Sequence, residues 1–160
     1  MFALCCTRKL LDRMKVPTVP KPPSSTRLGD WYCNEVRVAR ERYIIGVSDR
    51  TLLPVVLPGR DARHLGKMLP CWVAEVLKAL GVSRELVQAE LDEMRESVIS
   101  KTANRRVVGS LTDFASMLPS HLDAGDGIVQ CAVRLAEAPC SPIGGDRPRD
   151  LAMALLSSAA

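Results

Sequence analysis

The sequence has few aromatic residues, few histidines and no long apolar run. Aromatic residues make up only 4% of the 160 positions, so the core must be built from aliphatic side chains and Met. The two histidines, His64 and His121, have no second ligand at metal-binding spacing, which excludes a zincin-type site. No apolar stretch approaches the length of a membrane span, so we expect no membrane partner.

The cysteines exclude two further classes of protein. None of the six forms a C-x-x-C pair, which excludes a zinc finger or ribbon. No secretory signal precedes them, which argues against a disulfide framework. We therefore expect reduced, mostly buried thiols in a cytoplasmic protein, with no metal and no cofactor.

Motifs of recognisable enzymes are also missing. Gly144 and Gly145 lack both the preceding strand and the following Lys-Ser/Thr of a phosphate-binding loop. The chain has no nucleophile elbow of the G-x-S-x-G type. A Cys–His nucleophilic pair has no support in spacing, so the balance is against an enzyme.

What is present is an ordinary globular composition, 47% hydrophobic and 25% charged. A chain of this length buries about 70% of its unfolded surface without needing cross-links. We expect one domain over residues 1–150 and a tail over 151–160 that docks as a short helix or frays. The net charge is +4, and residues 1–50 carry ten Lys/Arg against five Asp/Glu. Such an asymmetry can attract phosphate or acidic partners, although an ordinary mixed solvated surface is the favoured explanation.

The first third of the chain predicts a strand, a short helix and a loop. Residues 2–6 form an unbroken apolar run typical of a buried strand. Thr7 is placed to cap a helix that bears Leu10, Leu11 and Met14 on one face. The Pro-rich residues 15–26 predict an extended, mobile internal loop.

Two apolar runs, 43–47 and 52–57, flank the polar residues 48–51 and predict a β-hairpin. Pro54 places the second strand at an edge or a bulge, because proline cannot donate to a ladder. Val36 and Val38 extend this unit into a third strand.

Helices dominate the rest of the pattern. Within 61–80 the apolar spacing predicts a helix that begins near Met68 or kinks at Pro70 and ends before Gly81. Ser83 caps a second helix over 84–96.

Residues 98–99 and 107–108 predict two short strands, or one strand and a loop. Ser110 and Asp113 resemble a capping box that opens a helix through Met117. Residues 128–138 predict a last helix, followed by a loop over 139–150. The class is α+β, a small mixed sheet with a β-hairpin packed against four to five helices.

Three polar clusters are candidates for a binding site. The first, residues 7–9, follows the first strand, where side chains often line a site. The second, residues 26–34, combines a Gly-Asp pair with two aromatics that form either core anchors or a ligand wall. The third is the basic segment 101–106, with Ser110 and Asp113 near it. Capping, core packing and a solvated turn are the alternative explanations. The candidate residues are Thr7, Lys9, Arg27, Asp30, Trp31, Asn34, Lys101, Arg105 and Asp113.

The same clusters carry a family resemblance. The sequence resembles a family of small bacterial proteins classed as a domain of unknown function, over about residues 4–140. Two departures concern Cys5, where the family commonly has Arg, and Leu111-Thr112, where it tends to have Met-Asn. An activity that needs that Arg or Asn would be missing here. The matching residues are Cys6, Thr7, Lys9, Gly29, Asp30, Trp31, Tyr32, Asn34, Arg50, Thr51, Leu52, Lys101, Thr102, Arg105, Gly109, Ser110, Asp113 and Phe114.

The resemblance implies a bacterial, cytoplasmic protein and names no reaction. The first hypothesis is a non-catalytic interaction module with an unknown protein partner. The second is a nucleic-acid-associated protein of a mobile-element or defence locus. The third is an enzyme whose site gathers Thr7, Lys9, Asp30, Asn34 and Lys101.

Overall fold

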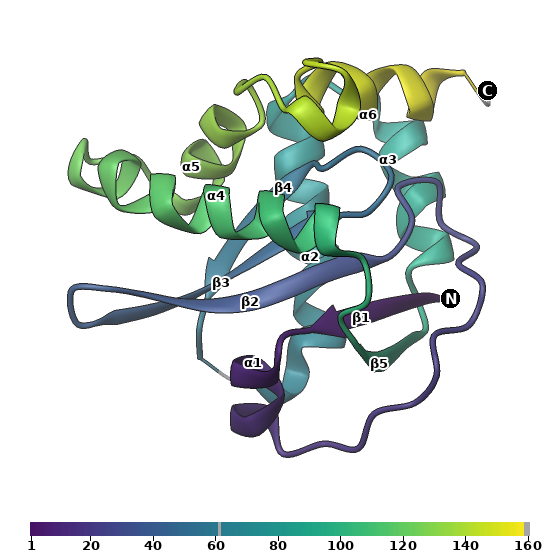
Figure 1. Ribbon diagram of the computed structural model, residues 1–160. Helices are drawn as coiled ribbons and strands as arrows, with labels where there is room; N and C mark the ends of the chain where they lie inside the picture. Colours follow the sequence, from purple (N-terminus) through teal and green to yellow (C-terminus); the bar gives the residue numbers. More distant parts are fainter. Residues whose placement is uncertain (61, 159–160) are drawn as a thin grey trace.

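The computed structural model describes residues 1–60 and 62–158. Within them lie a five-stranded mixed sheet and six α-helices, which confirms the α+β class and adds one helix to the expected number (Figure 1). The strands are β1 (Phe2–Cys6), β2 (Trp31–Val38), β3 (Glu41–Ser48), β4 (Pro54–Pro58) and β5 (Ser97–Lys101). The helices are α1 (Arg8–Met14), α2 (Leu65–Ala79), α3 (Arg84–Glu93), α4 (Arg105–Asp123), α5 (Ile128–Leu135) and α6 (Pro148–Ser157).

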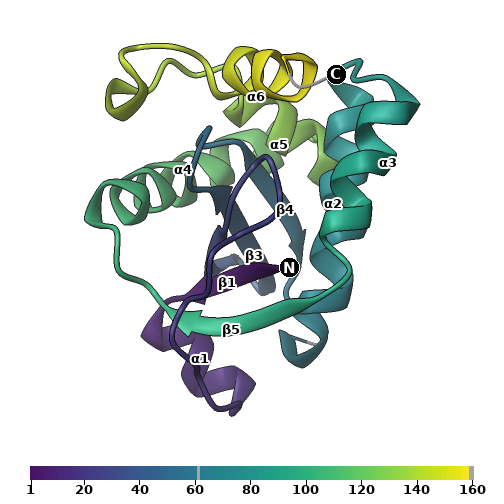
Figure 2. The ribbon, with the colours of Figure 1, turned by 90° about the vertical axis from the view of Figure 1, so that its right-hand side faces the viewer.

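The sheet has the order β4-β3-β2-β1-β5. β1 pairs in parallel with β2 on one side and with β5 on the other, whereas β3 is antiparallel to both β2 and β4. Helix α4 contacts β2 and β3, while α2 contacts β4, and Figure 2 shows these two helices on opposite sides of the sheet. The buried apolar strand β1 is therefore enclosed on both faces and both edges.

The hairpin prediction is confirmed, since β3 and β4 pair with Val47 opposite Pro54. β4 is an edge strand, as expected from Pro54. The third strand is longer than Val36–Val38, because β2 begins at Trp31. Trp31 and Tyr32 therefore belong to a strand and not to a turn.

Of the two alternatives for this helix, a start near Met68 is wrong, because α2 begins at Leu65 and continues through Pro70. Pro70 lies inside it, because one apolar face stays buried from Leu65 through Leu69 to Leu77 and outweighs the hydrogen bond that proline cannot donate. Helix α3 begins after Ser83, whose Oγ accepts the Leu86 N–H as a cap, and it ends at Glu93 rather than at 96.

Two predictions about residues 98–117 need correction. Val98 and Ile99 lie in β5, but Val107 and Val108 form no strand, since they lie in the first turns of α4. Ser110 is not a helix cap, because α4 begins five residues earlier and Asn104 accepts the Arg106 and Val107 N–H groups. The buried residues of α4 keep helical spacing from its start: Val107, Ser110, Leu111, Phe114 and Leu118.

The C-terminal part is more helical than predicted. Helix α5 ends at Leu135, and the expected loop over 139–150 is interrupted by a short 3-10 turn, Ser141–Ile143, and by the start of α6 at Pro148. The tail docks as a helix, with Ala152 and Leu156 buried, and residues 159–160 lie outside the described part.

The Pro-rich loop is extended and crosses the outer edge of β5. The Val19 N–H donates to the Ile99 carbonyl at 2.9 Å, and Ser100 Oγ donates to the Val19 carbonyl at 2.8 Å. Farther along, the Ser25 N–H donates to the Met1 carbonyl at 3.0 Å. The first of these bonds occupies the Ile99 carbonyl on the outer edge of β5, and the other two hold the loop against Ser100 and Met1.

Candidate functional site

A row of polar residues lies where β1 and β5 end, beside the neighbouring parallel strand β2, which continues past it to Val38. Cys6 of β1 lies in register with Cys33 of β2 and with Lys101 of β5. The next residues along the three strands are Thr7, Asn34 and Thr102. Thr7 Oγ1 donates to Asn34 Oδ1 at 2.6 Å, and the Thr7 N–H donates to the Cys33 carbonyl at 3.0 Å. We call this row the carboxyl edge.

Two connections leave the carboxyl edge. From β1 the chain passes through α1 and the Pro-rich loop to β2. From β5 it passes through residues 102–104 to α4, which contacts β2 and β3. In open α/β sheets, ligands bind in the crevice beyond the carboxyl ends of the strands. Here the ends of β1 and β5 lie side by side at that edge.

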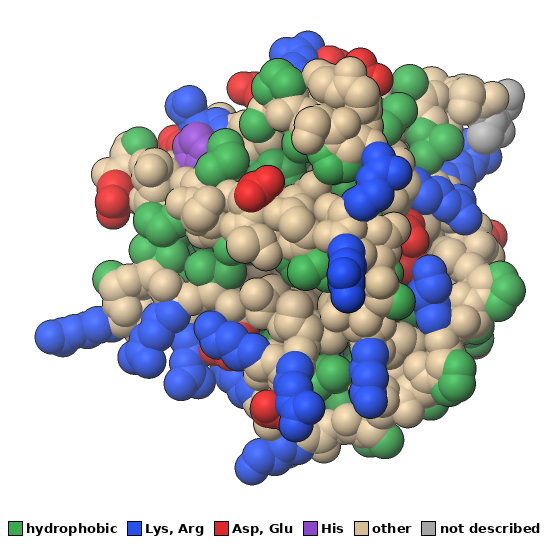
Figure 3. Space-filling view, in the orientation of Figure 1, with side chains coloured by type: hydrophobic (Ala, Val, Ile, Leu, Met, Phe, Trp, Pro, Cys, Tyr) green, Lys and Arg blue, Asp and Glu red, His purple; other side chains and the backbone are tan. Residues whose placement is uncertain are grey.

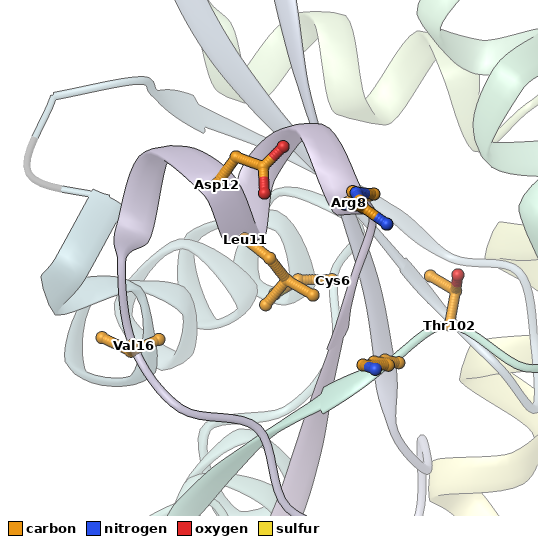
Figure 4. A pocket seen from close by; sticks show the side chains of 7 residues that line it. Cys6, Arg8, Leu11, Asp12, Val16 and Thr102 are labelled. Carbon is orange, nitrogen blue, oxygen red and sulfur yellow. The ribbon is translucent and has the colours of Figure 1, made fainter.

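A hollow of about 470 Å³ opens at this position. Its lining comes from the ends of β1 and β5, from α1 and from the second residue after α1: Cys6, Arg8, Leu11, Asp12, Val16, Lys101 and Thr102. Figure 4 shows Leu11 and Cys6 close together in the middle, with Arg8 and Thr102 on one side and Val16 on the other. The hollow thus has an apolar floor and a polar, mostly cationic rim.

The two cations of the rim have no protein partner. Arg8 and Lys101 are exposed, and neither side chain makes a hydrogen bond or ion pair with any residue that the structure describes. Asp12 lies one turn after Arg8 on α1, yet no ion pair joins them. Lys9 differs, because its Nζ donates to the Glu35 carbonyl at 3.4 Å.

The thiols of Cys6 and of its neighbours Cys5 and Cys33 all have raised pKa values. Burial raises the pKa of Cys6 to about 12, with a further contribution from Cys5, and burial likewise raises the pKa of Cys5 to about 12. Burial also raises the pKa of Cys33 well above its ordinary value. A thiol must ionise to act as a nucleophile, so these three cysteines are core residues.

Asp30 lies at the opposite end of the strands from the carboxyl edge. It precedes β2, and its Oδ1 accepts the Ala3 N–H at 2.7 Å while its Oδ2 pairs with Lys21 Nζ at 3.0 Å. Asp49 completes this network, since its Oδ1 accepts the Asp30 N–H at 3.0 Å. Of the five residues in the enzyme hypothesis, four gather near the carboxyl edge and Asp30 does not.

Arg27 and Trp31 also serve the fold near that opposite end. The Arg27 N–H and the Leu28 N–H both donate to the buried Glu90 carboxylate at 3.0 Å, and Arg27 Nη1 donates to the Leu156 carbonyl. Trp31 is fully buried and is the largest side chain of the core. Of the two uses considered for this aromatic, the structure has the core anchor.

The last two candidates lie on α4. Arg105 is exposed in its first turn, close in sequence to Lys101. Asp113 is exposed two turns later and lines a separate hollow with Phe114 and Cys140. Asp113 is therefore not part of the hollow at the carboxyl edge.

Basic residues surround the carboxyl edge. Figure 3 shows Lys and Arg side chains gathered along the lower half of that view, over the β2–β3 hairpin, α1 and the connection from β5 to α4. Segments 8–15, 37–42 and 101–106 carry ten Lys/Arg and two Asp/Glu, whereas the rest of the chain carries twelve and sixteen. We call these ten residues the basic face: Arg8, Lys9, Arg13, Lys15, Arg37, Arg40, Arg42, Lys101, Arg105 and Arg106.

Most of the basic face is unpaired. Glu35, which is buried, accepts from Arg13 Nη1 at 2.9 Å and lies 3.4 Å from Arg42 Nε. Arg106 donates to the Pro142 carbonyl. Six side chains of the face have no hydrogen bond or ion pair within residues 1–60 and 62–158: Arg8, Lys15, Arg37, Arg40, Lys101 and Arg105.

The tip of the β2–β3 hairpin concentrates positive charge on a projecting ribbon. Arg37 lies directly opposite Arg42 in the register, and Arg40 lies in the turn between the strands. Like charges directly opposite each other on paired strands are destabilising. The juxtaposition of Arg37 and Arg42 therefore does not itself stabilise the hairpin, although Arg42 also pairs with Glu35, and it suits a surface that meets an anion.

Sequence reasoning missed several of these residues. The hairpin arginines have a signal in the sequence, three Arg within six residues beside a predicted strand. Arg8 and Thr102 lay in the polar clusters but outside the candidate set. Leu11 was placed on the apolar face of the first helix, and Val16 fell within the predicted loop 15–26.

Membrane-spanning helices and metal-binding clusters are both absent from the described residues. No helix within residues 1–60 and 62–158 is long and apolar enough to cross a membrane. No group of three or more His, Cys, Asp or Glu side chains in those residues is placed to hold a metal ion.

The comparisons with known proteins give one match. Curated proteins and solved structures yielded no match. A family model described as a domain of unknown function, DUF6933, matches residues 3–151, and so includes the carboxyl edge and the whole basic face. The chain belongs to the DUF6933 family of proteins with a domain of unknown function.

Proposed function

We propose that this protein is a non-catalytic interaction protein and that its partner is duplex nucleic acid, bound through the basic face. One observation carries the proposal: three segments distant in the sequence place ten cations and two acids around one edge of the sheet. Six of those cations have no partner within the described residues. Phosphate neutralisation by such cations is the main source of nonspecific affinity for nucleic acid. Six free cysteines support the cytoplasm as the compartment.

The chemistry of the face favours nucleic acid over an acidic protein. Seven of the ten cations are Arg, whose planar guanidinium matches phosphate oxygens in a bidentate manner. The projecting β-ribbon has the dimensions that a major groove admits. Arg37 and Arg40 on that ribbon are exposed and unpaired within the described part of the chain.

The aromatic residues favour a duplex over a single strand. Proteins that bind single strands stack bases on exposed aromatic side chains. All six aromatic residues of this chain are described, and none is exposed; only Tyr43 and Trp72 are partly accessible. Contacts with a phosphate backbone therefore suit this surface better than contacts with splayed bases.

The enzyme hypothesis receives less support from the same geometry. Thr7 and Asn34 bond to each other, and Asp30, the only carboxylate of the proposed cluster, lies at the other end of the strands. Without Asp30 the cluster has no carboxylate to act as a general base, and its two lysines, Lys9 and Lys101, are exposed to solvent.

The test is binding of a fluorescent 20-base-pair duplex, measured by anisotropy over a series of NaCl concentrations. We expect the logarithm of the association constant to fall linearly with the logarithm of salt concentration. The double variant Arg37→Gln/Arg40→Gln should bind more weakly, and its salt slope should be smaller by about 2, because each lost phosphate contact removes about one unit.

The matched control is Arg84→Gln/Arg95→Gln, which removes the same charge from the region of the acidic helix α3. It should bind the duplex nearly as the unmodified protein does. Equal losses in the two double variants would reduce the effect to net charge and overturn the proposal. Absence of salt-dependent binding to duplex would overturn it as well, and preference for a single strand would contradict the choice of partner.

A further inference from the structure

The hollow at the carboxyl edge has the size of a small-molecule site. Its volume of about 470 Å³ lies in the usual range for ligand pockets, about 300–1,000 Å³. It lies beyond the adjoining carboxyl ends of β1 and β5, which is the end of the strands at which open α/β sheets place their ligands.

The rim of the hollow selects an anion. Arg8 from α1 and Lys101 from β5 come from segments more than ninety residues apart, and both line the hollow without a protein partner among the described residues. Two unpaired like charges held at one hollow repel each other unless an anion lies between them. The Thr102 hydroxyl, on the same side as Arg8 in Figure 4, adds a neutral donor.

The floor of the hollow selects an organic body. Leu11 and Val16 are half-buried and pack against the core, and Cys6 beneath them is almost fully buried. This apolar surface offers nothing to a bare inorganic ion. Asp12 on the rim can accept a hydrogen bond from a hydroxyl group, as found on a sugar ring.

We propose that this hollow binds an organic phosphate monoester, with the phosphate between Arg8, Lys101 and Thr102 and the sugar-bearing body against Leu11 and Val16. The site goes beyond the proposed function, because it takes a small ligand and does not need the arginines of the hairpin. A nucleoside 5′-monophosphate and the 5′-phosphorylated end of a strand present the same chemistry. The experiment distinguishes these two sources.

The experiment is calorimetric titration of the full chain with adenosine 5′-monophosphate, inorganic phosphate and adenosine. We expect saturable binding of the monophosphate, weaker binding of inorganic phosphate, which lacks the body, and no measurable binding of adenosine, which lacks the charge. Arg8→Gln and Lys101→Gln should each weaken monophosphate binding about tenfold or more, because each removes a charged hydrogen-bond donor. Both side chains are exposed and unpaired within the described residues, so these variants should fold normally, which circular dichroism checks.

Two controls separate this site from the duplex-binding surface. Arg84→Gln removes one charge far along the chain and should leave monophosphate binding unchanged. Arg37→Gln/Arg40→Gln should also leave monophosphate binding unchanged. Failure of the duplex proposal would therefore not affect the monophosphate proposal. The source of the phosphate is tested with two duplexes, one with a 5′-phosphate and one with a 5′-hydroxyl. If the 5′-phosphate duplex binds more tightly, and Lys101→Gln abolishes that difference in affinity, the ligand is a strand end. If the two duplexes bind equally, the ligand is a free small molecule.

Three results would overturn the proposal. The first is no saturable binding of the monophosphate. The second is equal binding of adenosine and its monophosphate, which would remove the role of the phosphate. The third is an equal loss in Arg84→Gln and Lys101→Gln, which would show a general charge effect and no built site.

Discussion

Gly29 is a position where a single added methyl group should destabilise this fold. Its φ of +84° is a conformation that residues with a Cβ adopt at a cost. A Cβ on Gly29 would also lie 2.0 Å from Asp49 Oδ1 and 2.8 Å from Arg50 Cγ. Asp49 could not stay in place, and its Oδ1 would lose the Asp30 N–H that it accepts at 3.0 Å.

The expected magnitude has two parts. The positive φ costs about 1 kcal/mol when glycine becomes alanine. Leaving the buried Asp30 N–H without its acceptor costs about 1–3 kcal/mol more. Gly29→Ala should therefore lower the free energy of unfolding by about 2–4 kcal/mol.

Gly81 provides the matched control. Its φ is +86°, almost the same as that of Gly29, but a Cβ there meets nothing within 4 Å. Gly81→Ala should therefore cost only the conformational part, about 1 kcal/mol. Urea unfolding followed by tryptophan fluorescence measures both variants against the native protein, with the slope checked for constancy. An equal decrease in the free energy of unfolding of the two variants would refute the reasoning, because the clash with Asp49 would then contribute nothing to the destabilisation.

Two further predictions concern buried side chains. Trp31→Ala should lower the free energy of unfolding by about 3–5 kcal/mol, because Trp31 is fully buried in the core; a stable variant in the same urea assay would contradict that role. Burial raises the pKa of Glu90 above its ordinary 4.5, so the folded protein holds that proton more tightly than the unfolded chain does. The resulting stability is fully present below about pH 4.5 and is lost as pH rises through the raised pKa. Glu90→Gln lacks this titration. Its free energy of unfolding, relative to that of the native protein, should therefore rise as the pH increases from about pH 4 to about pH 7. A difference that stays constant or falls over that range would exclude this role of Glu90.

Local sequence signals correctly predicted the elements whose apolar pattern is compatible with only one type of secondary structure. The run 2–6 and the hairpin around residues 48–51 have one plausible periodicity each, and both were confirmed. The start of α4 was missed because Val107 and Val108 favour a strand by propensity, while Asn104, the actual cap, looked like part of a basic turn. Helical burial through Leu118 overrides that propensity.

The candidate site was predictable only in part. Polar residues directly after apolar strands pointed to Thr7 and Lys101, and the structure brings the two strand ends into register. Asp30 precedes its strand, and a linear pattern does not reveal which end of the sheet a residue reaches once the chain crosses over. Register and crossover are long-range properties, so Arg8 and Lys101 could meet around one hollow only in three dimensions.

The Pro-rich loop covers the outer edge of β5, and this has a consequence for self-association. Val19 lies between Pro17 and Pro20, and Pro22 and Pro23 follow. The outer side of the loop therefore offers few amide hydrogens to an incoming strand. A second molecule cannot easily extend the sheet there, which protects the protein against fibril-like stacking at high concentration. Proteolytic nicking within residues 15–26 should remove this protection and leave β5 as the place where aggregation starts.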